Sequence, residues 1–426
     1  MGEQLLSMMV GLVDTFLVGH LGAAPLAAVG LANQWVFLVM SLFGAIAVGS
    51  TALIARFIGA RDPEQANHVL RQSMLLGAVL GTVTMALGLA FARPAVQVLG
   101  AQADYVDLAT GYLRVVSGVF ILSTLMFVGN ASLRGAGDTR TPFYVMLVVN
   151  ALNIVVAWTA INGPFGLPKL GVIGSALGAF VGRAVGGFLI LAILVKGRAG
   201  LQLGLKNLRA DRDLILRILR VGVPSGVEQF FFRTGQMVFT RIIAGLGTID
   251  FAASQVAISS WSLSFMPGFG FSIAATTLVG QALGAGDPDR AERLGYTSVR
   301  MGALLMGTAG LAFLLFPAQI VGIFTSDPEV IALGTLPLQM VGLIQPLLAS
   351  NMIFAGGLRG AGDTRFPMIT TGASIWLFRL PLSVLLAVIL GWGLGGAWAA
   401  FVLDMSLRGV VNYLRFRGGK WKGVKV

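Results

Sequence analysis

The chain has 426 residues, of which 56% are hydrophobic and only 11% are charged, and its mean hydropathy is +0.84. Soluble domains carry about 25% charged residues, so the composition excludes a water-soluble globule. The net charge is +12, but the basic residues stand at the ends of apolar runs, where they would lie beside anionic headgroups. This placement argues against nucleic-acid binding. Cysteine is absent, which excludes disulfides and thiolate metal sites.

Apolar segments long enough to cross a bilayer as helices follow one another along the whole chain. The alternation of apolar and polar residues that is typical of membrane β-strands is absent. We therefore predict an all-α polytopic membrane protein. The twelve predicted transmembrane segments are residues 1–20, 31–57, 69–92, 111–133, 142–163, 171–195, 217–246, 251–283, 294–317, 331–358, 366–391 and 393–415.

An internal repeat relates the two halves of the chain. The string LRGAGDTR occupies residues 133–140 and returns 225 positions later at 358–365, and IGARDPEQA at 58–66 aligns in the same register with LGAGDPDRA at 283–291. Six segments per half is an even number, so both halves enter the membrane from the same side and form parallel repeats. We expect an N-terminal six-helix lobe over residues 1–195, a cytoplasmic linker over 196–216 and a C-terminal six-helix lobe over 217–426.

The first segment is short at its inner end. Met1 aligns with Gly226 of the second half, where the corresponding helix is predicted to begin at about Arg217. Either Met1 lies inside the natural first helix, which is the alternative we favour, or the chain tolerates a short first helix.

The orientation follows from the loops, because cytoplasmic loops of membrane proteins are enriched in Lys and Arg. The side that holds both LRGAGDTR loops and the C-terminus carries twenty-two Lys and Arg residues, whereas the opposite side carries three, which are Arg93, Arg114 and Lys169. The repeated loops and the C-terminus are thus predicted to be cytoplasmic, in the inner membrane of a prokaryote.

The repeated glycine-rich loops predict turns rather than catalysis. RGAGD lacks the Gly-Lys-Ser/Thr ending of a phosphate-binding loop, and its aspartate is suited to cap the helix that follows. No nucleophile–base pair is visible, so the chain is not expected to be an enzyme or to need a cofactor. In segment six, Gly178, Gly182 and Gly186 recur every four residues, a spacing that favours close helix packing.

Ionisable residues inside the predicted segments are few, and each is a candidate site because burial in lipid is costly. Asp14 has no basic partner within one turn of its helix, and Glu3 lies on the same helical face. Glu228 occupies the repeat position of Glu3, with Arg233 near enough to compete for it. Burial raises the pKa of a carboxyl group, so Asp14 and Glu228 are predicted to bind and release H⁺ or Na⁺. Glu3, about three turns from Asp14 on the same helical face, is a further ion-coupling candidate.

Other polar residues in the segments have structural or ligand-binding interpretations. Asp404 and Arg408 stand four apart and are predicted to form a structural ion pair. Arg183, Arg241 and Arg379 are expected to serve packing or the membrane interface. Asn150 and Asn153 either orient a substrate or acid, or form hydrogen bonds between helices. Residues that would line a substrate cleft are Asn33, Gln34, Trp35, Asn150, Gln229 and Gln255.

Several motifs together resemble the multidrug and toxic compound extrusion (MATE) family of secondary transporters. They are GLVDTFLVGHLG in segment one, the paired GxxDPxxA and LRGAGDTRxP loops, VGVPSGVEQFFF in segment seven and MPGFGFSIAATTLVGQALGAGDP in segment eight. The resemblance covers nearly the whole chain. It implies two six-helix lobes in a V shape, and export of organic cations and amphipathic compounds in exchange for protons or sodium.

The resemblance also assigns residues. Asp14 matches an acid tied to ion coupling, and Glu228 matches a glutamate of one sodium-coupled branch. Asn153 matches part of a site in a proton-coupled branch, but the partner position of that site holds Ala157. The sodium-coupled branch has an aspartate where this chain has Leu347. The coupling ion therefore stays open.

A flippase for lipids or lipid-linked precursors is the alternative function, since such a protein has a similar architecture. It would need basic residues on the cleft wall, for which Arg183, Arg233, Arg241 and Arg379 are candidates. A scaffold without transport activity is disfavoured, because the longest loop is about twenty residues. We expect a monomer that meets the bilayer and small organic cations.

Overall fold

The computed structural model describes residues 17–164, 168–204 and 209–424. In these ranges the chain is helical and has no strand, apart from one isolated bridge between Arg198 and Leu201. The predicted all-α class is thus confirmed. The chain divides into two compact units between Gly222 and Val223, close to the boundary that the repeat predicts.

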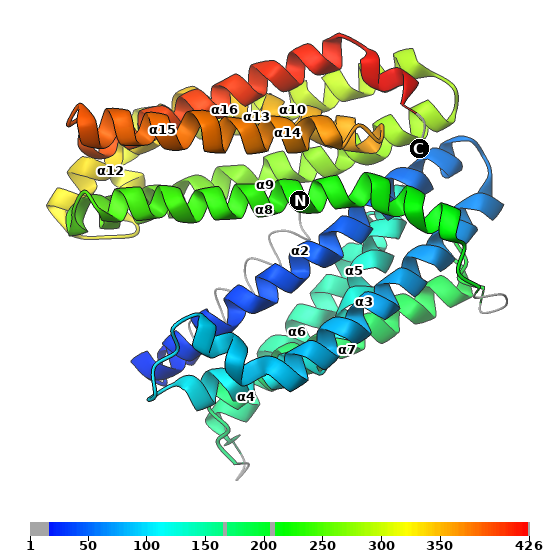
Figure 1. The fold of residues 1–426 in the computed structure, drawn as a ribbon, viewed down its shortest axis with the longest axis horizontal. Helices are drawn as coiled ribbons and strands as arrows, with labels where there is room; N and C mark the ends of the chain where they lie inside the picture. The colour runs from blue at the N-terminus through cyan, green and yellow to red at the C-terminus, as the bar shows by residue number, and fades with distance from the viewer. Residues whose placement is uncertain (1–16, 165–167, 205–208, 425–426) are drawn as a thin grey trace. The chain divides into compact units, whose positions relative to one another are not determined.

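The first unit contains the helices that follow the first predicted segment (Figure 1, blue to green). Asp62 begins α3 by accepting a hydrogen bond from the Gln65 backbone N–H at 3.1 Å, the cap expected of an Asp-Pro start. The helices are α2 (Ala23–Gly59), α3 (Pro63–Val98), α4 (Val106–Ser117), α5 (Phe120–Gly135), α6 (Arg140–Asn162) and α7 (Val172–Lys196).

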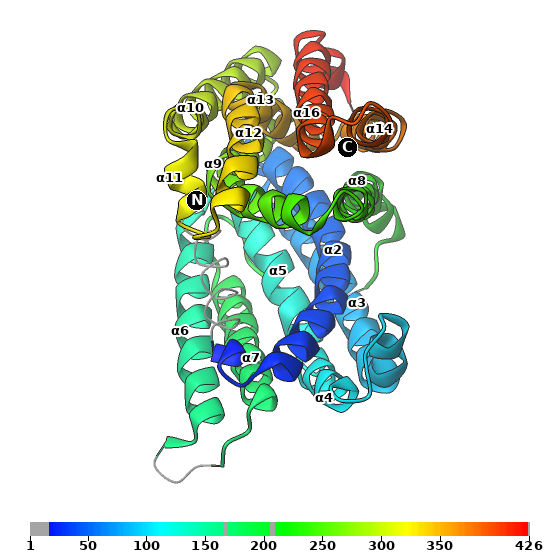
Figure 2. The ribbon, with the colours of Figure 1, turned by 90° about the vertical axis from the view of Figure 1, so that its left-hand side faces the viewer.

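The second unit repeats this order. Asp287 caps α10 through the Arg290 backbone N–H at 2.7 Å, as Asp62 caps α3. Figure 2 shows α14 and α16 side by side in this unit. Its first helix, α8 (Arg212–Ala244), begins before the boundary at Val223. The other helices are α9 (Thr248–Gly284), α10 (Pro288–Leu315), α11 (Pro317–Gly322), α12 (Pro328–Leu343), α13 (Gln345–Gly360), α14 (Arg365–Ala373), α15 (Leu380–Ser383) and α16 (Gly393–Arg417).

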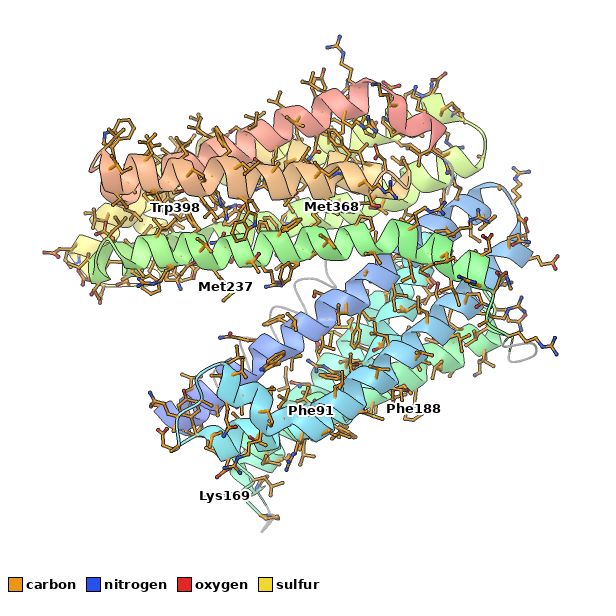
Figure 3. The ribbon with its side chains drawn as sticks, in the orientation of Figure 1. Phe91, Lys169, Phe188, Met237, Met368 and Trp398 are labelled. Carbon is orange, nitrogen blue, oxygen red and sulfur yellow. The ribbon has the colours of Figure 1, made fainter. Side chains whose placement is uncertain are left out.

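The helices have the length and composition of membrane spans. In the described part of the chain, seven are long and apolar enough to cross a membrane, or ten if three bent pairs count as one span each. Large apolar side chains such as Phe91, Phe188 and Met237 (Figure 3) are 57%, 62% and 67% exposed. The predicted segments after the first each coincide with one helix or helix pair.

Three predicted segments in the described part of the chain are bent, and two of them bend at corresponding positions of the repeat. The segment at 111–133 is the pair α4 and α5, which meet at 53°, and the segment at 331–358 is the pair α12 and α13, which meet at 57°. Pro346 lies in the first turn of α13, where its ring clashes with the carbonyl of the preceding turn and ends α12. The bends occupy the same place in both repeats.

The helices that precede the repeated loops make corresponding hydrogen bonds in the two units. Thr51 of α2 donates to the Ala131 carbonyl at 2.9 Å, and Thr276 of α9, its repeat counterpart, donates to the Gly356 carbonyl at 2.8 Å. A Cβ on Gly135 would lie 2.8 Å from the Thr51 carbonyl oxygen. Only glycine allows such an approach, so the glycine of LRG is a packing residue.

The helix after the second LRGAGDTR loop is unusual. Between α14 and α15 the residues Ser374–Arg379 form a π-helical segment, and a second one follows at Val384–Ile389. Pro381 lies between the two. Such segments are rare and occur frequently at functional sites.

Candidate functional site

Two of the predicted ion-coupling acids, Asp14 and Glu3, lie outside the described residues, which begin at Leu17. Their assignment therefore rests on the sequence. The other candidates divide between the two units, and each unit is considered separately.

In the first unit, Asn150 and Asn153 are buried on α6, at 5% and 3% exposure. The α7 glycines pack directly on this face, since a Cβ on Gly178 would lie 2.7 Å from the Asn153 carbonyl oxygen and one on Gly182 would lie 2.8 Å from the Val149 carbonyl oxygen. The predicted packing role of these glycines is confirmed. The Asn150 Nδ2 has no acceptor among the described residues, so this amide is available to a ligand or acid.

The predicted cleft residues differ in exposure. Gln34, Gln229 and Gln255 are exposed, and Asn33 is half-buried. The Trp35 indole donates to the Ala95 carbonyl of α3 at 2.8 Å, so this side chain ties α2 to α3. A role in packing accounts for Trp35.

In the second unit, Glu228 of α8 is held by an arginine that sequence reasoning did not pair with it. Arg359 donates to Oε1 from Nη2 at 2.7 Å and to Oε2 from Nε at 3.3 Å, and the Thr371 hydroxyl donates at 3.3 Å. Glu228 is 7% exposed. We expected Arg233 to compete for this carboxylate, whereas the partner in the structure is Arg359 of the second LRGAGDTR string. A residue predicted only as part of a turn thus neutralises a predicted ion site.

The pair Asp404–Arg408 of α16 belongs to a larger buried cluster. Arg408 Nη2 donates to Asp404 at 2.7 Å, and the Ser374 hydroxyl bonds the other carboxylate oxygen. Arg379 lies 3.9 Å from Asp404 and donates to Gln236 of α8 at 3.2 Å. Arg379 and Asp404 are fully buried. Of the two roles expected for Arg379, packing and the membrane interface, the structure fits packing, because its guanidinium lies inside the helix bundle.

The repeated loops are turns closed by ion pairs. Asp138 accepts from the Arg140 and Thr141 backbone N–H groups at 3.0 Å each and pairs with Arg198 at 3.1 Å. Burial alone would raise the pKa of Asp138, but hydrogen bonds from Thr141 and Arg198 outweigh it and lower that pKa. In the second copy Asp363 pairs with Arg415 of α16 at 2.8 Å.

A polar contact that the sequence did not reveal fastens the linker to α3. Arg71 can only donate, so its 3.2 Å bond makes His68 Nδ1 an acceptor, and Nε2 then donates to Asp211 at 2.9 Å. This hydrogen bond lowers the pKa of Asp211. Gln72 adds a 2.8 Å bond to the Arg209 carbonyl. The linker is therefore anchored before α8 begins.

Comparisons with family models and with the sequences of known proteins indicate the same family. The MatE family model matches residues 1–159 and 224–385. A Thermotoga maritima protein named "Probable multidrug resistance protein NorM" is 35% identical over 99% of this chain and 91% of its own length. The "Uncharacterized transporter YisQ" of Bacillus subtilis is 29% identical over 98% of this chain and 92% of its own.

Solved structures of transporters of this kind have the same fold as the chain. A crystal structure of MATE in the bent conformation has a TM-score of 0.91 and 25% identity, covering 98% of this chain and 92% of that one. A MOP superfamily transporter from Pyrococcus furiosus, described as having a binding pocket of reverse polarity, has a TM-score of 0.89 at 25% identity over the same shares. The chain therefore belongs to the MatE family, the transporters that its motifs resemble.

Proposed function

We propose that this protein is a secondary active exporter that expels cationic or amphipathic organic compounds in exchange for protons or sodium. The match of the MatE model to both halves of the chain carries the proposal. The relative from Thermotoga maritima, named for multidrug resistance, supports the substrate class.

We place the ion-coupling step in the first unit, at Asp14. The alternative site, Glu228, already receives two bonds from Arg359 and one from Thr371. A sodium ion or proton bound there would have to displace a guanidinium, and breaking a buried pair costs about 3–5 kcal/mol. Asn150 and Asn153, buried on α6, would orient the ion or the drug.

Alternating access supplies the mechanism. Asp14 releases its ion, the site admits a lipophilic cation, and return of the ion expels the cation. Coupling arises because ion and drug bind the two arrangements of the protein with different affinities. By the distribution of Lys and Arg, the LRGAGDTR loops and the C-terminus face the cytoplasm. Asn33, Gln34, Gln229 and Gln255 remain candidates for contact with substrate.

The test is efflux of a fluorescent organic cation from proteoliposomes under an imposed proton gradient or sodium gradient, one at a time. We expect Asp14→Asn to abolish ion-driven efflux. Asp107→Asn, at an exposed acid in the first turn of α4, is the matched control and should retain it. If Asp14→Asn transports normally, Asp14 has no part in coupling.

Lipid flipping is less well supported. A flippase needs guanidinium groups that can reach a phosphate, but Arg379, one of the four candidates, is 0% exposed. Arg233 and Arg241 are exposed on α8, so scrambling of a fluorescent phospholipid in the same proteoliposomes is the discriminating measurement.

A further inference from the structure

The cluster around Asp404 carries more positive than negative charge. Two guanidinium groups, of Arg379 and Arg408, meet one carboxylate, and the three side chains are at most 4% exposed. Arginine does not lose its proton in proteins, so the excess positive charge cannot be relieved by deprotonation. An uncompensated charge inside a membrane protein is costly and marks a functional site by default.

Part of the hydrogen-bonding capacity of these two arginines is unused. Nε and Nη1 of Arg379 and Nε of Arg408 are buried and have no acceptor among the residues that the structure describes. The Arg379 guanidinium packs against two neighbouring aromatic rings, with its central carbon 5.0 Å from the Phe239 ring centre and 5.2 Å from that of Phe401. Rings attract the face of a guanidinium, whereas its N–H groups point outward in its plane. The rings therefore leave those donors open to an acceptor.

The π-helical segment builds this arrangement. Ser374 and Arg379 are five residues apart, and in an α-helix they would point about 140° apart. In a π-helix, whose hydrogen bonds join residues five apart, the two side chains stand nearly above each other. Both can therefore reach Asp404 on the neighbouring helix α16. An energetically unfavourable backbone segment thus serves to bring Arg379 into the cluster.

We propose that the cluster of Arg379, Arg408, Asp404 and Ser374 is an occluded binding site for one small monovalent anion, of the class of chloride or a short carboxylate. One negative charge balances the cluster, and an acceptor in the guanidinium plane satisfies its open N–H groups. Only a small ion suits side chains that are wholly buried. The anion is distinct from the exported substrate, and it stabilises the packing of α8, the π-helical segment Ser374–Arg379 and α16.

Thermal unfolding of the purified full-length protein tests the site without any transport assay. Sodium chloride is exchanged for sodium gluconate at constant sodium and ionic strength. We expect the Tm to rise by about 1–3 °C for each tenfold increase in chloride above its dissociation constant. Arg379→Gln should remove this dependence. Arg93→Gln, at an exposed arginine paired with Asp107, should retain it.

A second measurement covers the case in which Arg379→Gln does not fold. Crystals of the unaltered protein soaked in sodium bromide should show an anomalous peak within hydrogen-bonding distance of Arg379. Sodium acetate in the unfolding assay separates the sources: stabilisation by acetate alone assigns the site to carboxylates, and stabilisation by chloride assigns it to halides. Equal Tm values in all three salts, a chloride dependence that persists in Arg379→Gln, or stabilisation by chloride without a bromide peak at the cluster would each overturn the proposal.

Discussion

The ion pair between Glu228 and Arg359 makes the sharpest stability prediction. Each charge is removed alone, by Glu228→Gln and Arg359→Gln, and then both together. The side chains of the pair are 10% and 19% exposed, so removing one partner leaves the other charge nearly buried. Breaking a buried pair costs about 3–5 kcal/mol. We expect about 2–4 kcal/mol here, because some solvent reaches the pair.

The double variant distinguishes pairing from packing. Loss of both charges leaves neither uncompensated, so the double variant should be more stable than the sum of the single effects predicts, with a coupling energy of about 1–3 kcal/mol. The measurement is thermal unfolding of the detergent-solubilised protein, in which each single variant should lower the Tm by about 4–8 °C. Strictly additive effects would refute the idea that Arg359 is the counter-ion of Glu228.

Three further predictions concern packing and pH. Gly360→Ala should lower the free energy of unfolding by about 1–3 kcal/mol, because a Cβ there would lie 2.1 Å from the Thr276 carbonyl oxygen. Gly30→Ala is the control and should not destabilise the protein, since open space surrounds Gly30. Equal Tm values for the two variants would contradict this prediction. Trp421→Ala should lower the free energy of unfolding by about 3–5 kcal/mol. The indole is buried, stacks on the Phe416 ring at 4.5 Å and donates to the Phe416 carbonyl. An unchanged Tm would show that the C-terminal turn is dispensable for stability. The lowered pKa of Asp138 stabilises the folded state above the unfolded pKa of about 3.9, and this stabilisation is lost as the pH falls through the folded value. The Tm difference between wild type and Asp138→Asn should therefore shrink below about pH 4, and a difference independent of pH would contradict it.

The sequence predicts well those features that depend on residues close together in the chain, namely helices, helix caps and ion pairs within one helix. The run lengths locate the described helices to within eight residues at either end. The i,i+4 spacing of Asp404 and Arg408 predicts a contact that the structure contains at 2.7 Å. The Asp-Pro strings predict the caps at Asp62 and Asp287. Each of these depends on residues within about one helical turn of each other.

What the sequence does not predict depends on distant partners or on the backbone departing from a regular helix. Glu228 and Arg359 are 131 positions apart, and no helical spacing relates them. Arg379 reaches Asp404 because of a π-helical segment, which shifts the helical face by more than a quarter turn relative to an α-helix. The sequence SIWLFR of this segment contains no glycine or proline from which the π-helical conformation could be predicted.

The contacts Glu228–Arg359 and Asp404–Arg379 show that buried acids of the second unit have arginine partners. In the described part of the second unit, Glu228, Asp363 and Asp404 each have an arginine partner within 2.9 Å. A carboxylate held by a guanidinium must give up that partner before it can bind a sodium ion or a proton, and breaking a buried pair is costly. An exporter still needs an acid that can load and unload a cation, and Asp14 lacks a basic neighbour within one turn of its own helix. The arginine partners in the second half are therefore the structural reason to look for ion coupling in the first half of the chain.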